Sequence, residues 1–303
     1  MEKQLTSTTI QPETLLKELH ELWASLAREK NPQGLLRACS MTLFIITEDG
    51  QDTAAARRIA GNLMRAHPSR IIIIEVATGA RLQGRVFAEC HRGAGGNDQI
   101  CSEGVEIVAG AAQFGELACL AAPLVTPDLP VMMWCRGPRV FSSSDFEPLF
   151  ALARKIIVDS CSAPDAPLAL AAIKRMRAHQ QIADLSWTRL TGWREALAHR
   201  LEAKAADPAG IRFASIRYGR AAEPCAHYLK YWILRAAPLA RIDLEPVSSA
   251  EGVHAVSVSC AEAEITVSAS EARAARRNET ELICEELSIA GPDPVFDDLL
   301  SRI

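Results

Sequence analysis

The sequence predicts an α/β N-terminal domain with a largely parallel, helix-covered sheet, followed by an α+β C-terminal domain with an antiparallel sheet. In the first half, helical patterns alternate with short continuous apolar runs, which are typical of strands buried on both faces. In the second half, the strand-like segments alternate apolar and polar residues, as half-exposed antiparallel strands do. Residues 162–167 are rich in Pro, Ser and Asp, so we expect domains at 1–165 and 166–303.

The elements of the first half follow from hydrophobic periodicity. Residues 12–30 place leucines and Trp23 at helical spacing, and residues 41–47 form an apolar run of strand length. Residues 70–75 contain four successive isoleucines, which favours a central strand with both faces covered. We further expect a helix at 53–65, an antiparallel strand pair at 85–91 and 99–108, helices at 112–121 and 145–154, and strands at 129–135 and 155–159.

The second half begins with helical patterns and then changes character. Residues 168–179 and 188–205 are expected to be helices, separated by residues 183–187. A further helix is expected at 222–235, and residues 294–302 close the chain. Alternating patterns predict strands at 211–218, 239–244, 253–259, 264–269 and 281–289.

Composition excludes several classes of protein. The chain has 303 residues, of which 49% are hydrophobic and 23% charged, so it can build a packed core. A net charge of −4 and an aromatic content of 5% argue against nucleic acid or an anionic membrane as the main partner. The charge-free run at 117–127 is shorter than the ~18 apolar residues of a membrane span. Residues 1–5 lack the apolar region of a signal peptide, so we expect a cytoplasmic protein.

The nine cysteines are spread along the chain, and no two of them form a C-x-x-C pair. In an unsecreted chain they are expected to be mostly reduced, buried thiols, which behave as small hydrophobic residues. A redox-sensitive pair stays open as the alternative, because thiol function depends on spatial environment.

Two segments of the first half contain candidate ligand-binding groups. Arg70 follows His67 and Ser69 between a helix and a buried strand, and its guanidinium could anchor a carboxylate or phosphate. A tight connection capped by polar side chains is the favoured interpretation. The glycine run Gly93–Gly96 lacks the spacing and the following helix of a dinucleotide-binding motif, which favours a hairpin turn.

The densest cluster of distinctive residues covers 184–194. Asp184 or Ser186 would cap the following helix, and Trp193 belongs to an apolar helix face that Arg189 and Arg194 flank. Tryptophan with neighbouring arginine is typical of interaction hot spots. The alternative, that this helix simply docks onto its own domain, stays open.

Catalytic and metal-binding motifs such as H-E-x-x-H and G-x-S-x-G do not occur in the sequence, so we expect no catalytic residue, metal or cofactor. The run 226–230 resembles the His-Tyr-Leu run near the catalytic histidine of glucose-6-phosphate dehydrogenases. The aspartate expected before that histidine is Ala226 here, and a general base without its orienting carboxylate is poor.

Three segments in order along the chain carry a family resemblance: 67–72, the run Leu129-Pro130-Val131-x-x-Trp134, and 184–194. With the helix around Tyr231 and Trp232, they resemble the bacterial glucose-6-phosphate dehydrogenase assembly proteins of the OpcA family. Cys135 departs from the pattern, since a second tryptophan often follows Trp134. The motif or partner-binding candidates are His67, Ser69, Arg70, Trp134, Asp184, Trp187, Arg189, Trp193 and Arg194.

The resemblance implies a non-catalytic binding partner that promotes assembly and allosteric activation of glucose-6-phosphate dehydrogenase, in the oxidative pentose phosphate pathway of carbohydrate metabolism. It also implies thioredoxin-type redox control in some members. The main alternative is a sugar-phosphate- or nucleotide-binding sensor or enzyme that uses Arg70 and Gly93–Gly96. A third hypothesis is a scaffold that joins enzyme subunits without changing their kinetics.

Overall fold

The structure is a computed structural model, and it divides the chain into two units, Met1–Ile157 and Val158–Ile303. The domain boundary expected near residue 165 stays a prediction that limited proteolysis can test. The described residues are 10–29, 35–92, 99–110, 113–248, 251–261, 263–272, 277–289 and 291–303.

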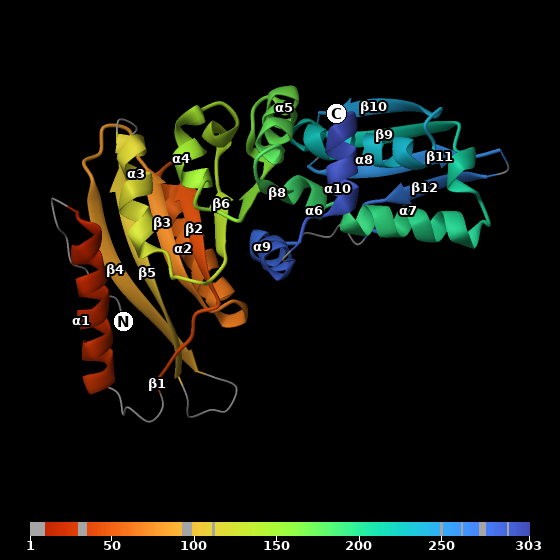
Figure 1. Cartoon of the computed structure of the whole chain (residues 1–303). Helices are drawn as coiled ribbons and strands as arrows, with labels where there is room; N and C mark the ends of the chain where they lie inside the picture. The colour runs from red at the N-terminus through yellow and green to blue at the C-terminus, as the bar shows by residue number, and fades with distance from the viewer. Residues whose placement is uncertain are drawn as a thin grey trace. The chain divides into compact units, whose positions relative to one another are not determined.

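A largely parallel sheet forms the first unit, as the sequence predicts (Figure 1). The strand order is β1-β5-β3-β2-β6-β7, all parallel, and β4 pairs antiparallel with β5. Every residue of the central strand β2 is buried, which explains why its sequence is continuously apolar. The bounds are β1 Leu35–Arg37, β2 Met41–Thr47, β3 Ser69–Val76, β4 Gln83–Arg92, β5 Gln99–Ala109, β6 Val131–Cys135 and β7 Lys155–Val158.

Helices connect β2 to β3, β5 to β6 and β6 to β7, and α1, which precedes β1, lies along β4 (Figure 1). Their bounds are α1 Pro12–Glu29, α2 Gly50–Ala66, α3 Phe114–Ala121 and α4 Glu147–Phe150. The helix expected at 145–154 is shorter than predicted, because the chain turns after α4 to bring Arg154 to β6. There the Arg154 N–H donates to the Val131 carbonyl at 2.8 Å.

A cross-strand disulfide joins Cys90 of β4 to Cys101 of β5. The prediction of reduced thiols is therefore wrong for these two residues. The register of the antiparallel pair places them directly opposite each other, where side chains on one face come into contact. The remaining cysteines are free thiols: Cys39, Cys119, Cys135, Cys161, Cys225, Cys260 and Cys284.

The second unit contains a mostly antiparallel sheet in the order β10-β9-β11-β12. β10 is the exception to the predicted antiparallel sheet, because it runs parallel to β9. The helix α8 connects these two strands and returns the chain to the same end of the sheet, as a parallel pair requires. The bounds are β8 Gln181–Asp184, β9 Phe213–Gly219, β10 Arg241–Val247, β11 Val253–Ser259 and β12 Glu264–Ser268, with helices α5 Ala166–Arg177, α6 Leu185–Thr188, α7 Thr191–Ala203, α8 Glu223–Ala236, α9 Glu279–Ser288 and α10 Pro294–Arg302.

The strand predicted at 281–289 is wrong, because this segment is the helix α9. Asn278 and Glu281 form a capping box, in which each side chain accepts the backbone N–H of the other residue. The buried residues then recur at helical spacing: Leu282, Ile283, Glu286 and Leu287. Within the described residues, no helix combines the length and the apolar character needed to cross a membrane.

We expect Asn278→Ala to lower the free energy of unfolding by about 1 kcal/mol, because it removes the acceptor for the Glu281 N–H. Urea unfolding monitored by circular dichroism measures this change. Asn278→Ser is the matched control and should stay close to the original stability, since serine caps helices about as well as asparagine. Equal losses in both variants would contradict the capping role.

Candidate functional site

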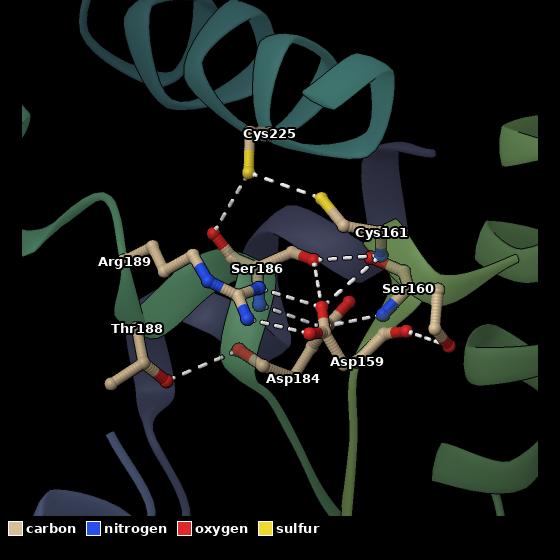
Figure 2. A network of polar contacts seen from close by, with 9 residues as sticks. Asp159, Ser160, Cys161, Asp184, Ser186, Thr188, Arg189 and Cys225 are labelled. Atoms are coloured by element: carbon tan, nitrogen blue, oxygen red, sulfur yellow. Dashed lines mark hydrogen bonds and ion pairs between the residues drawn. The ribbon is translucent and has the colours of Figure 1, made fainter. Parts of the chain in front are cut away.

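A buried polar cluster in the second unit surrounds two aspartates, each next to the end of a strand (Figure 2). Asp184 ends β8, and Asp159 directly follows β7. The Asp184 carboxylate is fully buried and accepts hydrogen bonds from the backbone N–H groups of Ser160 (3.0 Å) and Ser186 (2.9 Å). It also accepts the hydroxyl of Tyr228 on α8 at 2.6 Å. Asp184 therefore caps the short helix α6 and also connects α6 to α8. The helix predicted at 188–205 is α7, and its N-cap Leu190 makes no side-chain hydrogen bond, so the predicted cap by Asp184 or Ser186 is wrong for that helix.

Burial controls the protonation of this pair. It raises the pKa of Asp184, the nearby Asp159 carboxylate raises it further, and hydrogen bonds from Ser160 and Tyr228 oppose the shift. Burial and the neighbouring Asp184 also raise the pKa of the Tyr228 hydroxyl well above its ordinary value. Tyr228 consequently keeps its proton and acts as a hydrogen-bond donor to Asp184.

Arg189 and Asp159 form a bidentate ion pair, with both nitrogen–oxygen distances at 2.6 Å. Burial alone would lower the pKa of Arg189, but the Asp159 carboxylate more than offsets this effect and raises it. Asp159 also accepts the hydroxyl of Ser186 at 2.9 Å and the backbone N–H of Cys161 at 3.2 Å. The acceptor oxygens of Asp159 are thus used by contacts inside the unit.

Two thiols face each other beside these aspartates, and Figure 2 shows Cys225 directed toward both Cys161 and the Ser186 carbonyl. The sulfur atoms of Cys161 and Cys225 are 3.6 Å apart, and Cys225 donates to the Ser186 carbonyl at 3.3 Å. The hydrogen bond to Cys161 and burial raise the pKa of Cys225 well above its ordinary value. A protonated thiol is a weak nucleophile, so Cys225 does not have the character of a catalytic cysteine.

Aromatic stacking extends the cluster toward α10. The Trp187 indole N–H donates to Asp293 at 2.8 Å, and its ring stacks on Phe296. The Arg194 guanidinium lies 3.5 Å from the centre of the Trp187 ring and donates to the Thr191 hydroxyl at 3.1 Å. Burial lowers the pKa of Arg194 to about 10, an effect that nearby acids including Asp293 oppose. Trp187 is thus enclosed by its own unit.

The predicted residues of the 184–194 segment therefore come together, but as internal supports. Trp193 is buried in α7, and the Thr188 hydroxyl donates to Glu286 on α9 at 2.6 Å. These contacts match the alternative drawn from the sequence, in which the helix of this segment docks onto its own domain. The role of Asp184, Trp187, Arg189, Trp193 and Arg194 in partner binding stays a proposal.

The other candidates belong to the first unit and do not form one cluster there. Arg70 is buried, and it donates to Glu103 at 2.7 Å and to the Leu124 carbonyl at 2.8 Å. Ser69 and Trp134 are buried in β3 and β6, and His67 caps α2. Within the described residues, the predicted anion anchor Arg70 is thus engaged in internal contacts. The predicted sugar-phosphate or nucleotide site also used the glycine run Gly93–Gly96, which lies outside the described residues.

Carboxylates occupy the end of β2, where the sheet changes winding direction and open α/β sheets often bind ligands. Asp49 caps α2 by accepting the Asp52 N–H at 2.9 Å, and Asp52 accepts from Arg136 at 2.6 Å. Glu48 accepts the Arg139 N–H at 2.7 Å, and burial raises its pKa. A phosphate group bound here would lie at the N-terminus of α2, where it would meet the backbone N–H groups. Negatively charged side chains occupy that position instead.

Sequence reasoning missed the partners of the predicted residues. Asp159, Cys161, Tyr228, Glu286 and Asp293 are all members of the cluster, and none was a candidate. One signal was available, because Asp159 directly follows an apolar strand, just as Asp184 is the last residue of β8. Among the described residues, no group of histidine, cysteine or carboxylate side chains could hold a metal ion.

The fold and the cluster define a protein with an α/β unit followed by an α+β unit, in which buried polar groups connect helices to strands. Two family models match it in order. The model described as "Glucose-6-phosphate dehydrogenase subunit N-terminal domain" matches residues 60–175, and the corresponding C-terminal domain model matches residues 180–300. The chain therefore belongs to the OpcA family of glucose-6-phosphate dehydrogenase assembly proteins.

Its similarity to a curated protein is consistent with this family. The chain is 28% identical over 145 residues to the OxPP cycle protein OpcA of Nostoc punctiforme. The matched part is 46% of this chain and 31% of that protein, so the chain spans about a third of the relative's length.

Several solved structures share a distant likeness. The dehydrogenase WlbA of Thermus thermophilus has a TM-score of 0.45 and 11% identity, covering 86% of this chain and 92% of that one. Biliverdin reductase of Synechocystis has a TM-score of 0.45 and 9% identity, covering 86% and 96%. Scyllo-inositol dehydrogenase of Lactobacillus casei has a TM-score of 0.42 and 8% identity, covering 88% and 94%. These likenesses carry no conclusion about ligand or activity.

Proposed function

We propose that this protein is a non-catalytic, cytoplasmic partner of glucose-6-phosphate dehydrogenase that promotes its assembly and activates it allosterically. The oxidative pentose phosphate pathway is then the process it serves. Family membership points to the dehydrogenase as the partner. One structural observation supports a role without catalysis: the aspartates Asp159 and Asp184 of the buried cluster accept hydrogen bonds from their own unit.

An activator of this kind needs only differential binding. If the chain binds the active conformer of the enzyme about 1.4 kcal/mol more tightly than the inactive one, the conformational equilibrium shifts about tenfold. No acid–base pair is required for that effect. The contacts of Arg70 with Glu103 and of Asp52 with Arg136 likewise use groups that a sugar-phosphate or nucleotide would otherwise need.

The test is a steady-state assay of the dehydrogenase from the same organism, with and without the purified chain. We expect a lower KM for glucose 6-phosphate or a higher kcat, together with co-elution of the two proteins in size-exclusion chromatography. The heat-unfolded chain is the control. Unchanged kinetics without co-elution would contradict the proposal, and an oligomer shift with unchanged turnover would favour a scaffold.

The same assay addresses thioredoxin-type control, which we include in the proposal. Two pairs of sulfur atoms lie close together, the Cys90–Cys101 disulfide and the Cys161–Cys225 thiols at 3.6 Å. Activation should then differ between reducing and oxidising conditions. Identical activation in both conditions would remove redox control from the proposal.

A further inference from the structure

A groove of about 570 Å³ opens between three helices of the second unit, α7, α8 and α10. We call it the α7–α8–α10 groove. Its floor is apolar, because Leu197 and Leu201 of α7 and Ile233 of α8 are buried beneath it. Ile211, which precedes β9, completes the floor. A concave apolar surface of this size accommodates the side chains of another molecule.

Trp232 lines this groove and is only half-buried. Within the described part of the chain, its indole makes neither a hydrogen bond nor a ring contact, in contrast to Trp187, whose N–H donates to Asp293. A tryptophan provides a large apolar area and one polar donor, which is why this residue is enriched in interaction hot spots. Trp232 is therefore suited to an external contact.

An exposed apolar side chain follows the lining of the groove in the sequence. Leu239 lies three residues after Ala236, which lines the groove, and it is 100% exposed. Phe213 of β9 is also 38% exposed, but it alternates with the buried Ala214, so it lies on the sheet face away from α8 and outside the groove. A fully exposed leucine this near the groove lining in the chain is available for an external contact.

The rim of the groove has a surplus positive charge. Arg235 of α8 and Arg302 of α10 both donate to one oxygen of Asp298, at 2.9 and 3.3 Å. Two guanidinium groups thus share one carboxylate, and all three side chains are more than a third exposed. A carboxylate supplied by another molecule would give the second guanidinium a partner of its own. That contact would contribute the modest free energy typical of an exposed ion pair.

We propose that the α7–α8–α10 groove, together with Leu239, is the docking surface for one amphipathic helix of the partner enzyme. That helix presents a large apolar side chain to Trp232 and an aspartate or glutamate to Arg235 and Arg302. A groove bounded by helices suits this mode, in which the apolar face of a helix fills the groove. This inference rests on the proposed function, since it takes the dehydrogenase as the occupant.

Two substitutions test the surface, with binding of the full-length chain to the dehydrogenase measured by biolayer interferometry. Leu239→Asp should raise Kd at least tenfold, because it removes an apolar contact and adds a charge of the same sign as the partner's carboxylate. Arg235→Glu should raise Kd and also reduce its salt dependence between about 0.05 and 0.5 M NaCl, since exposed charges are screened over that range.

Matched controls come from α5, whose residues do not line the groove. Leu168→Asp changes another exposed leucine, and Arg175→Glu reverses another exposed arginine, so both should leave Kd within a factor of two or so of the original. Urea unfolding checks that all four variants stay folded.

The outcomes separate the docking surface from the proposed function. If the original chain binds the dehydrogenase and neither groove substitution weakens binding more than its control, the docking surface is wrong. If the original chain does not bind, the proposed function fails instead. If the chain alone forms dimers that Leu239→Asp dissociates while dehydrogenase binding is unchanged, the occupant is a second copy and the proposal is overturned.

Discussion

Asp184→Ala is expected to lower the free energy of unfolding of the second unit by about 3–5 kcal/mol. The substitution leaves the N–H groups of Ser160 and Ser186 and the hydroxyl of Tyr228 without their acceptor. Each unsatisfied buried donor destabilises by roughly 1–3 kcal/mol, and the space of the carboxylate becomes a cavity. Urea unfolding measures the loss, with the near-ultraviolet circular dichroism of the aromatic residues as the signal.

Two variants make this result specific. Asp207→Ala removes an exposed helix cap and should lower the unfolding free energy by about 1 kcal/mol at most. Asp184→Asn keeps an oxygen for the two N–H groups and can donate to the Tyr228 oxygen, so its loss should be much smaller than that of alanine. Equal losses for the alanine and asparagine variants would contradict the hydrogen-bonding role.

The pH dependence of the asparagine variant follows from the raised pKa of Asp184. A carboxyl whose pKa is raised by folding contributes its full stability below its ordinary pKa of 3.8. That contribution is lost as the pH rises through the raised value of the folded state. Asparagine resembles the protonated form at every pH, so the stability of Asp184→Asn relative to the original chain should improve as the pH rises from 3.8. A constant difference would contradict the raised pKa.

Glu103→Leu is expected to destabilise the first unit by about 3–5 kcal/mol, because it leaves the buried Arg70 guanidinium without its carboxylate. The Trp23 indole N–H also donates to Glu103 and loses its acceptor. Thermal and urea unfolding of the single variant measure this effect.

The double variant Arg70→Met/Glu103→Leu is the informative comparison. Replacing both members of a buried ion pair by apolar residues is often neutral or stabilising, so the double variant should recover most of the loss. A double variant as unstable as Glu103→Leu would show that the surroundings require the ion pair. Calorimetric titration of the double variant with glucose 6-phosphate also tests whether Arg70 binds a ligand. If Arg70 makes internal contacts only, its replacement should leave any binding of glucose 6-phosphate unchanged.

Local patterns predicted the first unit well because its strands are continuous in the sequence. Residues 70–75 are apolar enough to define β3. The pattern at 281–289 predicts a strand where the structure has α9, because nine residues fit a period of 2 almost as well as a period of 3.6. The capping box at Asn278 and Glu281 was the signal that separates the two.

The partners in the candidate site could not be predicted, because they are distant in the sequence. Arg70 meets Glu103 33 residues away, and Trp187 meets Asp293 106 residues away. A side chain that could bind an external phosphate looks identical, in sequence, to one that holds a neighbouring strand. Only the packing of strands and helices decides between those roles, and no local pattern encodes it.

The contacts of α6 also determine when this protein can fold as the ribosome makes it. Trp187 bonds to Asp293, and Thr188 bonds to Glu286 98 residues later. A nascent chain that has delivered everything up to α8 still lacks both acceptors, and their donors would stay unsatisfied inside the unit. The second unit should therefore complete its structure only after α9 and α10 have emerged, whereas the strands of the first unit are already made. Translation that stops short of Glu286 would leave a folded first unit attached to an incomplete second one.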